Sequence, residues 1–494
     1  SPSEEFYVLR FSPENNAKQI PAKKSIWYYN VDLSGKQLSS QTQFVCSTQN
    51  GSSFFELMLS WDDVYPYNPF FSEGVGFNLC FVKAAGDKDK NYYYLKYDKR
   101  IQSELSKREY LRLNFRNTDK LGKTFTLAQP VKRNFTSAEN PRIVFISSSS
   151  AERLISYSIE ISSTENSNKT NYVFERKIKK GLSRNEIEIP LSSLSTGNYE
   201  LHWQAGDNSE GKNTFTILPS IEYKAEKSTL DKLKDRTSKG NYSTILFRLQ
   251  SIVSSLNKLK PYETAEAILK RYSVYSGYIT ALSNNIDSLS EKRGIFRRAF
   301  LSNVDSTLQP YTIKLPLNYN ANNKYPLLVM LHGSGSDDTE ILSGIPLSED
   351  NFIEIAPYGR GTSNCFTTDN AQTDIKEAIE DLIRNYSVDT SNIIIAGFSM
   401  GGYGAYRTFY EYPKLFKAIA VFSGHPNLAT KWIGEGYPDF LKDEFLIPFN
   451  NVPIFIYHSK NDLNCPYELT KELVNKLINA GAKTEIKIVE ESGH

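Results

Sequence analysis

A serine between two glycines is the residue of this sequence best suited to nucleophilic chemistry. The string Gly397-Phe398-Ser399-Met400-Gly401 follows an apolar run at 393–396 and opens a helical pattern that ends before Pro413. Glycines on both flanks suit a sharp strand-to-helix turn, where the serine backbone is strained and neighbouring backbones come close. We therefore interpret Ser399 as a nucleophile for acyl transfer, the alternative being an incidental serine in a glycine-rich turn.

A serine hydroxyl needs a general base and an acid that orients the base. In such sites the chain order is serine, acid, histidine, each on a loop after a strand, and of the five histidines only His458 and His494 fit. His458 leaves no strand-end acid between itself and the serine, whereas Asp462 precedes His494 in a loop after an apolar strand. We predict Ser399, Asp462 and His494 as the catalytic triad. The alternative for Asp462 is a helix-capping carboxylate.

An oxyanion that develops during acyl transfer needs two backbone N–H donors. We predict the amide of Met400, directly after the nucleophile, and the amide of Ser334 in the loop His332-Gly333-Ser334-Gly335. That loop has an alternative interpretation as an ordinary turn. Arg360 lies in another loop, where it either contacts a substrate carboxylate or is a solvated cation.

The four cysteines show no Cys-x-x-Cys spacing, so we expect no structural metal, and no motif indicates a cofactor. Cys365 and Cys465 both fall on loops at carboxyl ends of strands. We expect that the sheet brings them together and that an oxidising compartment lets them form a disulfide.

The elements around these residues indicate an α/β fold over 296–494. Short apolar strands alternate there with amphipathic helices, which is typical of a mostly parallel sheet with crossover helices. Before it, residues 221–295 carry apolar side chains at spacings of three and four, which predicts a helical connector.

The N-terminal half is predicted to be β structure. Short alternating runs separated by Asn, Gly and Pro clusters predict a β-sandwich over 1–135, and a second, smaller sandwich of immunoglobulin-like size over 140–218. With 494 residues the chain has room for about three domains.

Composition excludes several classes of partner. The 58 basic and 56 acidic residues leave a net charge of +2, which gives no overall attraction to nucleic acid or anionic lipid. No apolar run approaches the roughly 18 residues that span a bilayer, and the mean hydropathy is -0.45. We expect no nucleic-acid partner and no membrane span.

The C-terminal motifs together resemble the α/β-hydrolase superfamily, in particular feruloyl esterases, polyhydroxybutyrate-depolymerase-like esterases and prolyl-oligopeptidase-like hydrolases. The resemblance covers 296–494 and implies a carboxylic ester hydrolase, or a peptidase, that works through an acyl-enzyme. One departure is that family members carry a helix after the histidine, whereas this sequence stops on His494. The segments that carry the resemblance are Leu331-His-Gly-Ser-Gly335, Ala356-Pro-Tyr-Gly-Arg-Gly361, Ala396-Gly-Phe-Ser-Met-Gly-Gly402, Phe422-Ser-Gly424, His458-Ser-Lys-Asn-Asp462 and Ser492-Gly-His494.

A second resemblance, of residues 59–79, is to carbohydrate-binding sandwiches found beside glycan-degrading esterases. Flat aromatic rings match the apolar faces of sugars, so we take Trp27, Trp61, Tyr65 and Tyr67 as candidate sugar-stacking residues. The alternative is that these rings fill the sandwich core or pack on the hydrolase.

We therefore expect a secreted serine esterase that removes feruloyl or acetyl groups from polysaccharide. One rival is a prolyl-oligopeptidase-like serine peptidase, although the N-terminal part lacks the period of about 40 residues that a propeller blade shows. The second rival is a glycan-binding protein with an inactive hydrolase domain. The start at Ser1, without Met, suggests a mature N-terminus or a cut in a longer chain, and we expect a secreted, cell-surface or periplasmic location.

Overall fold

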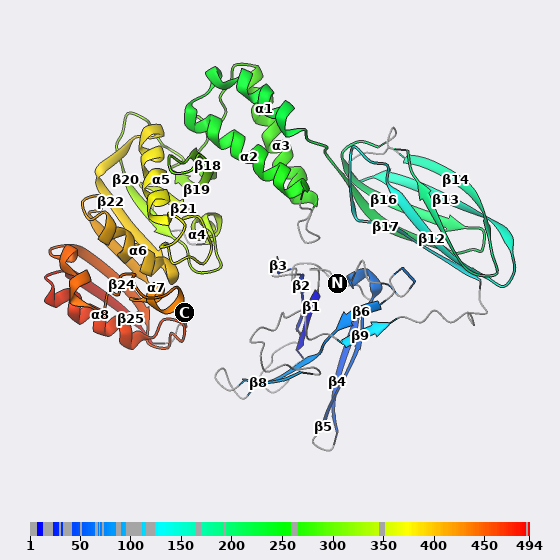
Figure 1. Cartoon of the computed structure of the whole chain (residues 1–494), viewed down its shortest axis with the longest axis horizontal. Coiled ribbons are helices and arrows are strands. Elements are labelled where there is room, and N and C mark those ends of the chain that lie inside the picture. The colour runs from blue at the N-terminus through cyan, green and yellow to red at the C-terminus, as the bar shows by residue number, and fades with distance from the viewer. Residues whose placement is uncertain are drawn as a thin grey trace. The chain divides into compact units, whose positions relative to one another are not determined.

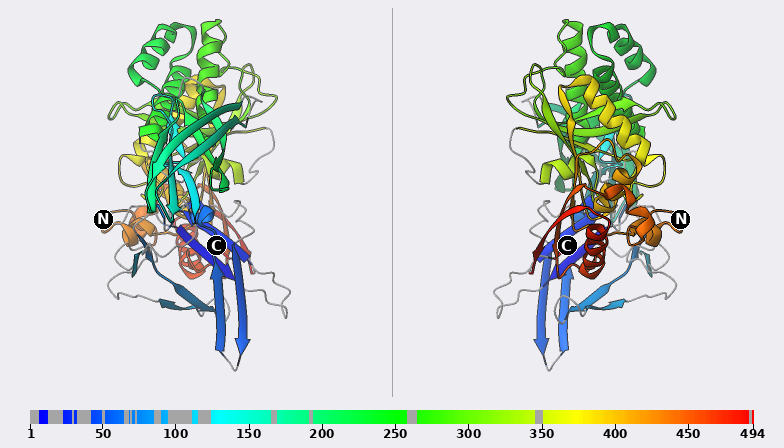
Figure 2. Two further views of the ribbon diagram at one scale, coloured as in Figure 1. Left: turned by 90° about the vertical axis from the view of Figure 1, so that its right-hand side faces the viewer. Right: turned by 90° about the vertical axis from the view of Figure 1, so that its left-hand side faces the viewer.

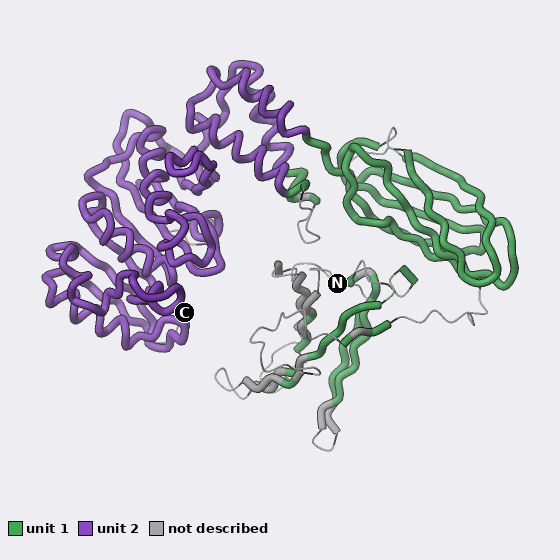
Figure 3. The backbone as a smooth tube through the Cα atoms, viewed as in Figure 1, with its two compact units in different colours: residues 1–221, 255–270 green, residues 222–254, 271–494 purple. Residues whose placement is uncertain are grey.

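The computed structural model describes residues 124–490 except 165–168, 191–193, 258–264 and 345–350, together with 493–494 and short segments between 7 and 114. Two compact units divide the chain: residues 1–221 with 255–270, and residues 222–254 with 271–494 (Figure 3). Within these described ranges, no helix combines the length and the apolar character that crossing a membrane requires.

The first 114 residues contain short, mostly antiparallel strand pairs. Strands β4 (Gln43–Gln49) and β5 (Ser52–Met58) are one such pair, seen as adjacent blue arrows in Figure 2. The region is rich in β structure, but much of the sandwich predicted for 1–135 lies outside the described residues. The remaining strands are β1 (Tyr7–Ser12), β2 (Lys23–Tyr28), β3 (Val31–Asp32), β6 (Gly74–Phe77), β7 (Cys80–Ala84), β8 (Lys90–Tyr94) and β9 (Leu111–Asn114).

Two sheets follow and share one apolar core. Along the strands buried and less buried side chains alternate, so that Phe145 of one sheet and Leu201 and Trp203 of the other belong to a single buried cluster. The first sheet has the order β10 (Phe125–Pro130), β12 (Arg142–Ser149), β15 (Gly181–Glu188), and the second the order β11 (Asn134–Thr136), β17 (Glu210–Leu218), β16 (Gly197–Ala205), β13 (Arg153–Ser163), β14 (Lys169–Ile178).

Three helices lie where the helical period predicted them: α1 (Tyr223–Lys232), α2 (Lys239–Asn257) and α3 (Ala265–Ser283). The first part of α2 is tied to the strand that opens the large sheet. The buried Arg298 guanidinium donates to Asn241 Oδ1 at 2.7 Å, and the Ala299 amide donates to Thr244 Oγ1 at 3.1 Å. These buried bonds join residues 222–254 to the large sheet, which belongs to the same compact unit.

The large sheet has eight strands, mostly parallel, and can be followed in Figure 1. Only the pairings of β18 with β19 and of β19 with β21 are antiparallel. This mixed sheet with flanking helices agrees with the α/β fold predicted for the C-terminal region. Its order is β18 (Gly294–Leu301), β19 (Leu308–Leu315), β21 (Ile353–Pro357), β20 (Tyr325–Leu331), β22 (Val388–Phe398), β23 (Ala418–Phe422), β24 (Pro453–Ser459), β25 (Lys483–Val489).

Helices cover both faces of this sheet. Alternate residues of β20 divide between two buried clusters, with Leu327 and Val329 in the larger and Met330 in the smaller. Helices α5 (Ala371–Asn385), α6 (Met400–Glu411), α7 (Leu428–Trp432) and α8 (Tyr467–Asn479) contribute to the larger cluster, and α4 (Asp338–Gly344) contributes to the smaller. Because β20 to β25 run parallel, their carboxyl ends lie on one edge of the sheet.

Candidate active site

Ser399 occupies a one-residue turn between β22 and α6. Its backbone angles are φ 55° and ψ -115°, a conformation that L residues rarely adopt. The flanking glycines permit the turn: a Cβ on Gly397 would lie 1.9 Å from the Gly401 carbonyl oxygen, and a Cβ on Gly401 would lie 2.0 Å from the Leu331 carbonyl oxygen. The strain at Ser399 is held by close backbone packing on both sides.

The structure brings Ser399, Asp462 and His494 together in a hydrogen-bonded chain. His494 Nε2 lies 2.7 Å from Ser399 Oγ, and His494 Nδ1 lies 3.0 Å and 2.9 Å from the two carboxylate oxygens of Asp462. The ring of Phe398 lies 5.0 Å from the imidazole, centroid to centroid. With Nδ1–H donated to the carboxylate, Nε2 is free to accept the serine proton.

Asp462 is buried and accepts several hydrogen bonds. Burial by itself raises the pKa of this carboxyl. Hydrogen bonds from the Cys465 amide, the His494 imidazole and the Asn464 amide lower it by more, so the pKa lies below its usual value. The two amides donate to Oδ1 at 2.8 Å and 2.9 Å. Asp462 is therefore ionised at neutral pH and fixed in orientation.

The other strand-end histidines face different partners. His458 is fully buried, and its Nε2 donates to the Cys465 carbonyl at 2.7 Å, while Thr470 Oγ1 lies 3.1 Å from its Nδ1. His425 lies 3.1 Å from Lys431 Nζ, and burial lowers its pKa to about 4. Within the described part of the chain, His494 is the histidine hydrogen-bonded to Ser399.

The two amides predicted for the oxyanion hole flank the nucleophile. A Cβ on Gly333, the residue before Ser334, would lie 3.7 Å from Ser399 Cβ, so this loop runs beside the serine. Met400 is the first residue of α6. Among the described residues neither the Ser334 amide nor the Met400 amide donates a hydrogen bond, which leaves both available to a ligand oxygen.

The loop of Ser334 rests on the segment 358–363, a support that the sequence analysis did not predict. The Gly335 amide donates to the Thr362 carbonyl at 2.7 Å, and the hydroxyls of Ser334 and Ser363 lie 2.8 Å apart. His332 Nε2 donates to the Tyr358 carbonyl at 3.1 Å. No sequence motif marks Ser363 or Thr362, since their role depends on contacts across about 28 residues.

The disulfide predicted between Cys365 and Cys465 is wrong, because both thiols are free. Cys365 lies in the segment after β21 and Cys465 in the segment after β24, and three strands separate these two in the sheet. Four strand spacings amount to about 19 Å, whereas a disulfide needs Cα atoms within about 7 Å. Burial raises the pKa of Cys365 to about 11 and that of Cys465 to about 12, so both stay protonated at neutral pH.

Among the described residues, Asp462, Cys465 and His494 form a group that could hold a metal ion, with ligand atoms within 4.8 Å of one another. Their arrangement, however, is that of a hydrogen-bonded pair beside a thiol. The 2.9 Å between His494 Nδ1 and Asp462 Oδ2 is shorter than the roughly 3.4 Å that separates two ligands of a tetrahedral ion with bonds of about 2.1 Å. The donor set therefore suits proton transfer better than metal binding.

Of the four aromatic candidates for sugar binding, two lie within the described residues and two do not. Trp61 opens a 3₁₀ turn, Trp61–Val64, and is 42% exposed. Trp27 pairs with Val8 and Asp32 in the first small sheet. Tyr65 and Tyr67 lie outside the described residues.

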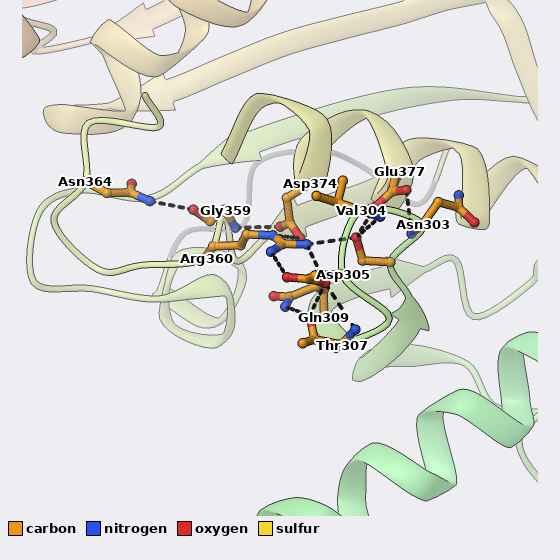
Figure 4. Close-up of polar contacts among 11 residues, drawn as sticks. Asn303, Val304, Asp305, Thr307, Gln309, Gly359, Arg360, Asn364, Asp374 and Glu377 are labelled. Atoms are coloured by element: carbon orange, nitrogen blue, oxygen red, sulfur yellow. Dashed lines mark hydrogen bonds and ion pairs between the residues drawn. The ribbon is translucent and has the colours of Figure 1, made fainter. Parts of the chain in front are cut away.

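Arg360 belongs to neither of the environments predicted for it. Its guanidinium is mostly buried between Asp305 and Asp374: Nη1 donates to Asp305 Oδ2 at 2.5 Å, and Nε lies 3.4 Å from Asp374 Oδ1 (Figure 4). Ser302 connects this cluster to Glu377 through a 2.7 Å hydrogen bond. The burial of Asp374 raises its pKa to about 7, although Arg360 acts in the opposite direction.

The raised pKa of Asp374 predicts a pH-dependent stability. A carboxyl that binds its proton more tightly when folded stabilises the protein below its unfolded pKa near 4 and loses this contribution as pH rises through about 7. The free energy of unfolding should therefore fall between pH 4 and 7, by up to about 1.4 kcal/mol per pH unit from this group. Asp374→Asn should flatten that slope in urea titrations at several pH values. Asp389→Asn is the control, because hydrogen bonds from Ser391 and Asn392 hold the pKa of Asp389 below its usual value; an unchanged slope in the Asp374 variant contradicts the prediction.

The fold and the geometry of Ser399 define a class. A mostly parallel sheet with a strained serine between strand and helix, followed by an acid and a histidine on later strand ends, is the arrangement of the α/β-hydrolase superfamily. The C-terminal region resembles the serine esterases of that superfamily.

Comparison with known proteins gives more particular similarities. Residues 366–494 match the model of the prolyl oligopeptidase family. The chain is 31% identical over 123 residues to the Probable feruloyl esterase C of Aspergillus niger, covering 23% of this chain and 46% of that protein. It is 30% identical over 123 residues to the Acetylxylan esterase of Coprinopsis cinerea, covering 21% of this chain and 32% of that protein. The chain thus spans less than half the length of these curated relatives.

Among solved structures, a ferulic acid esterase from Anaeromyces mucronatus in complex with ferulic acid aligns with a TM-score of 0.35 and 19% identity. The alignment covers 40% of this chain and 84% of that chain.

Proposed function

We propose that this protein is a serine carboxylic ester hydrolase that removes acyl groups from polysaccharide through a covalent acyl-enzyme. The observation that carries the proposal is the unbroken hydrogen-bonded chain from Ser399 Oγ through His494 to the buried carboxylate of Asp462. An incidental serine would need neither the strained backbone nor a histidine at 2.7 Å.

In the first half of the proposed reaction, Ser399 Oγ attacks the ester carbonyl carbon and His494 Nε2 takes the hydroxyl proton. The carboxylate of Asp462 stabilises the imidazolium that forms. The carbonyl oxygen becomes an oxyanion, which the amides of Met400 and Ser334 hold by hydrogen bonds. The C–O bond then breaks, and the sugar hydroxyl leaves with the proton from His494.

In the second half a water molecule replaces the alcohol. His494 removes a proton from that water, whose oxygen attacks the acyl carbon of the Ser399 ester. Collapse of the second tetrahedral intermediate breaks the bond to Ser399 Oγ, which recovers its proton from His494. The free carboxylic acid leaves, and no oxidant or reductant takes part.

Two relatives favour an ester on polysaccharide as the substrate, because their names are those of a feruloyl esterase and an acetylxylan esterase. We therefore propose feruloyl or acetyl as the acyl group. A polymeric substrate of this kind lies outside the cell, so the proposal includes export of the protein.

A serine peptidase is the second candidate, because residues 366–494 match the prolyl oligopeptidase family model. Both reactions use the same triad and differ in the leaving group, an alcohol for an ester and an amine for a peptide. The geometry of Ser399, Asp462 and His494 is equally suited to either.

A panel of chromogenic substrates separates these candidates. We expect the full chain to hydrolyse p-nitrophenyl acetate and methyl ferulate, and to release ferulate or acetate from arabinoxylan, with little turnover of a proline-containing peptide anilide. Faster peptide cleavage than ester cleavage would replace the esterase by the peptidase, and no turnover of any substrate would favour a glycan-binding protein with an inactive hydrolase region.

The exposed Trp61 supports a sugar-binding role for the N-terminal region. We propose that this region holds the enzyme on its polysaccharide. Retention of the full chain on insoluble xylan should weaken in Trp61→Ala, with turnover of p-nitrophenyl acetate unchanged. Equal retention of both proteins would count against this role.

A further inference from the structure

The segment 358–363 touches both the oxyanion loop and the buried ionic cluster around Arg360. On one side it supports residues 332–335 through the carbonyls of Tyr358 and Thr362 and the hydroxyl of Ser363. On the other side it carries Arg360, which lies between the β18–β19 turn and helix α5 (Figure 4). The segment therefore links Arg360 to the loop that carries the Ser334 amide.

The backbone of the segment is strained at its centre. Gly359 has φ 62° and Arg360 has φ 60°, and the second is the left-handed conformation in a residue that carries a Cβ. Such a residue keeps this conformation only where surrounding contacts impose it. At Arg360 the contacts that can do so are those of its side chain and of its neighbour Gly359.

Those contacts are polar, and the Arg360 and Asp374 side chains that make them are mostly buried. The Arg360 side chain is 9% exposed; its Nη1 and Nη2 donate to both carboxylate oxygens of Asp305, at 2.5 Å and 3.3 Å, and Nη2 also donates to Ser302 Oγ at 2.8 Å. Asp374, 1% exposed, lies 3.4 Å from Nε and accepts the Gly359 amide at 3.1 Å. A forked guanidinium makes such contacts in a fixed direction, which a lysine cannot reproduce.

We propose that Arg360 is a positioning residue of the active site, which fixes the segment 358–363 and through it the loop that presents the Ser334 amide to the oxyanion. The inference rests on the proposed acyl transfer at Ser399. Arg360 touches no reacting atom. Its effect reaches the reaction through Thr362 and Ser363, which hold Gly335 and Ser334.

The test compares Arg360→Gly with the wild type in the full chain. Glycine accepts a φ of 60° without strain, so the variant removes the guanidinium while easing the backbone. We expect kcat for p-nitrophenyl acetate to fall about 30-fold with KM changed less than threefold, because a displaced oxyanion donor weakens the transition state more than substrate binding. Labelling of Ser399 by a fluorophosphonate, whose phosphoryl oxygen occupies the oxyanion site, should slow by a similar factor.

Two rescue measurements separate positioning from stability. Guanidinium ion at a few tens of millimolar should restore part of the kcat of Arg360→Gly, and Arg360→Lys should be intermediate. Asp305→Asn is a second variant that spares folding, because Asp305 is 37% exposed; it should lower kcat about fivefold.

Lys314→Met is the matched control. Lys314 of β19 pairs at 3.1 Å with the fully buried Glu354 of β21 in the same sheet, and neither residue belongs to 332–335 or 358–363. It should lower the melting temperature and leave kcat within twofold. The proposal is overturned if Arg360→Gly keeps kcat within twofold, or if Lys314→Met loses as much kcat at an equal loss of stability. An equal activity of wild type and Ser399→Ala would instead overturn the proposed function itself.

Discussion

Ser399→Ala should lower kcat for p-nitrophenyl acetate about a million-fold, which corresponds to about 8 kcal/mol of transition-state stabilisation. Without Oγ no covalent intermediate forms, and His494 Nε2 loses the hydroxyl that lies 2.7 Å away. The amides of Met400 and Ser334 remain, so a small rate above that in water should survive. The rate of acid release, measured at saturating ester, checks this prediction.

Ser399→Gly adds a second readout to the same position. Because the backbone at Ser399 has φ 55°, glycine should raise the free energy of unfolding by about 1 kcal/mol while activity is lost as in the alanine variant. Ser391→Ala, at an exposed serine near the start of β22 whose hydroxyl donates to Asp389, is the control that should keep wild-type activity and should not raise the free energy of unfolding. A Ser399 variant that keeps a tenth of the wild-type kcat would end the assignment of the nucleophile.

The positions of the triad residues followed from patterns that are local in the chain. An apolar run, a glycine-rich turn and a helical pattern together place Ser399 at a strand end. Asp462 and His494 each follow an apolar run, which the structure shows as β24 and β25. Parallel strands bring their carboxyl ends to one edge whatever the loops do in detail. Local pattern and chain order were therefore enough to bring these three side chains into one prediction.

The cysteine pair shows where such reasoning stops. Cys365 and Cys465 both follow strands that end on the same edge, but their separation depends on the order of strands across the sheet. That order is a long-range property, which arises from the packing of helices over the whole sheet rather than from any segment. Two residues can therefore lie on the same edge of the sheet and still be far apart along it.

Arg360 shows the same limit for charge. Its partners Asp305 and Asp374 lie 55 residues before it and 14 residues after it in the chain, so no local pattern pairs them. When only the loop sequence is considered, Arg360 is expected to be either a solvated cation or a contact for the substrate. The fold supplies two carboxylates and removes most of the solvent, which makes the side chain part of the structure.

Asp462→Asn should lower kcat about ten-thousand-fold with the fold retained. Asp462 Oδ1 accepts the amides of Asn464 and Cys465, and an asparagine oxygen can keep both bonds. The new NH₂ group then faces His494 Nδ1, which can accept from it only when the ring proton lies on Nε2. A protonated Nε2 cannot take the proton of Ser399, so the loss arises from the wrong tautomer and not from unfolding.

The control for this change is Asp443→Asn, the same substitution at an exposed carboxylate that pairs with Lys476 on the surface. It should leave kcat within twofold. If Asp462 only capped the start of α8, its asparagine variant would also stay near wild-type activity, because asparagine accepts the same amide hydrogens. A large loss at Asp462 with unchanged melting temperature therefore distinguishes an acid that orients His494 from a carboxylate that merely ends a loop.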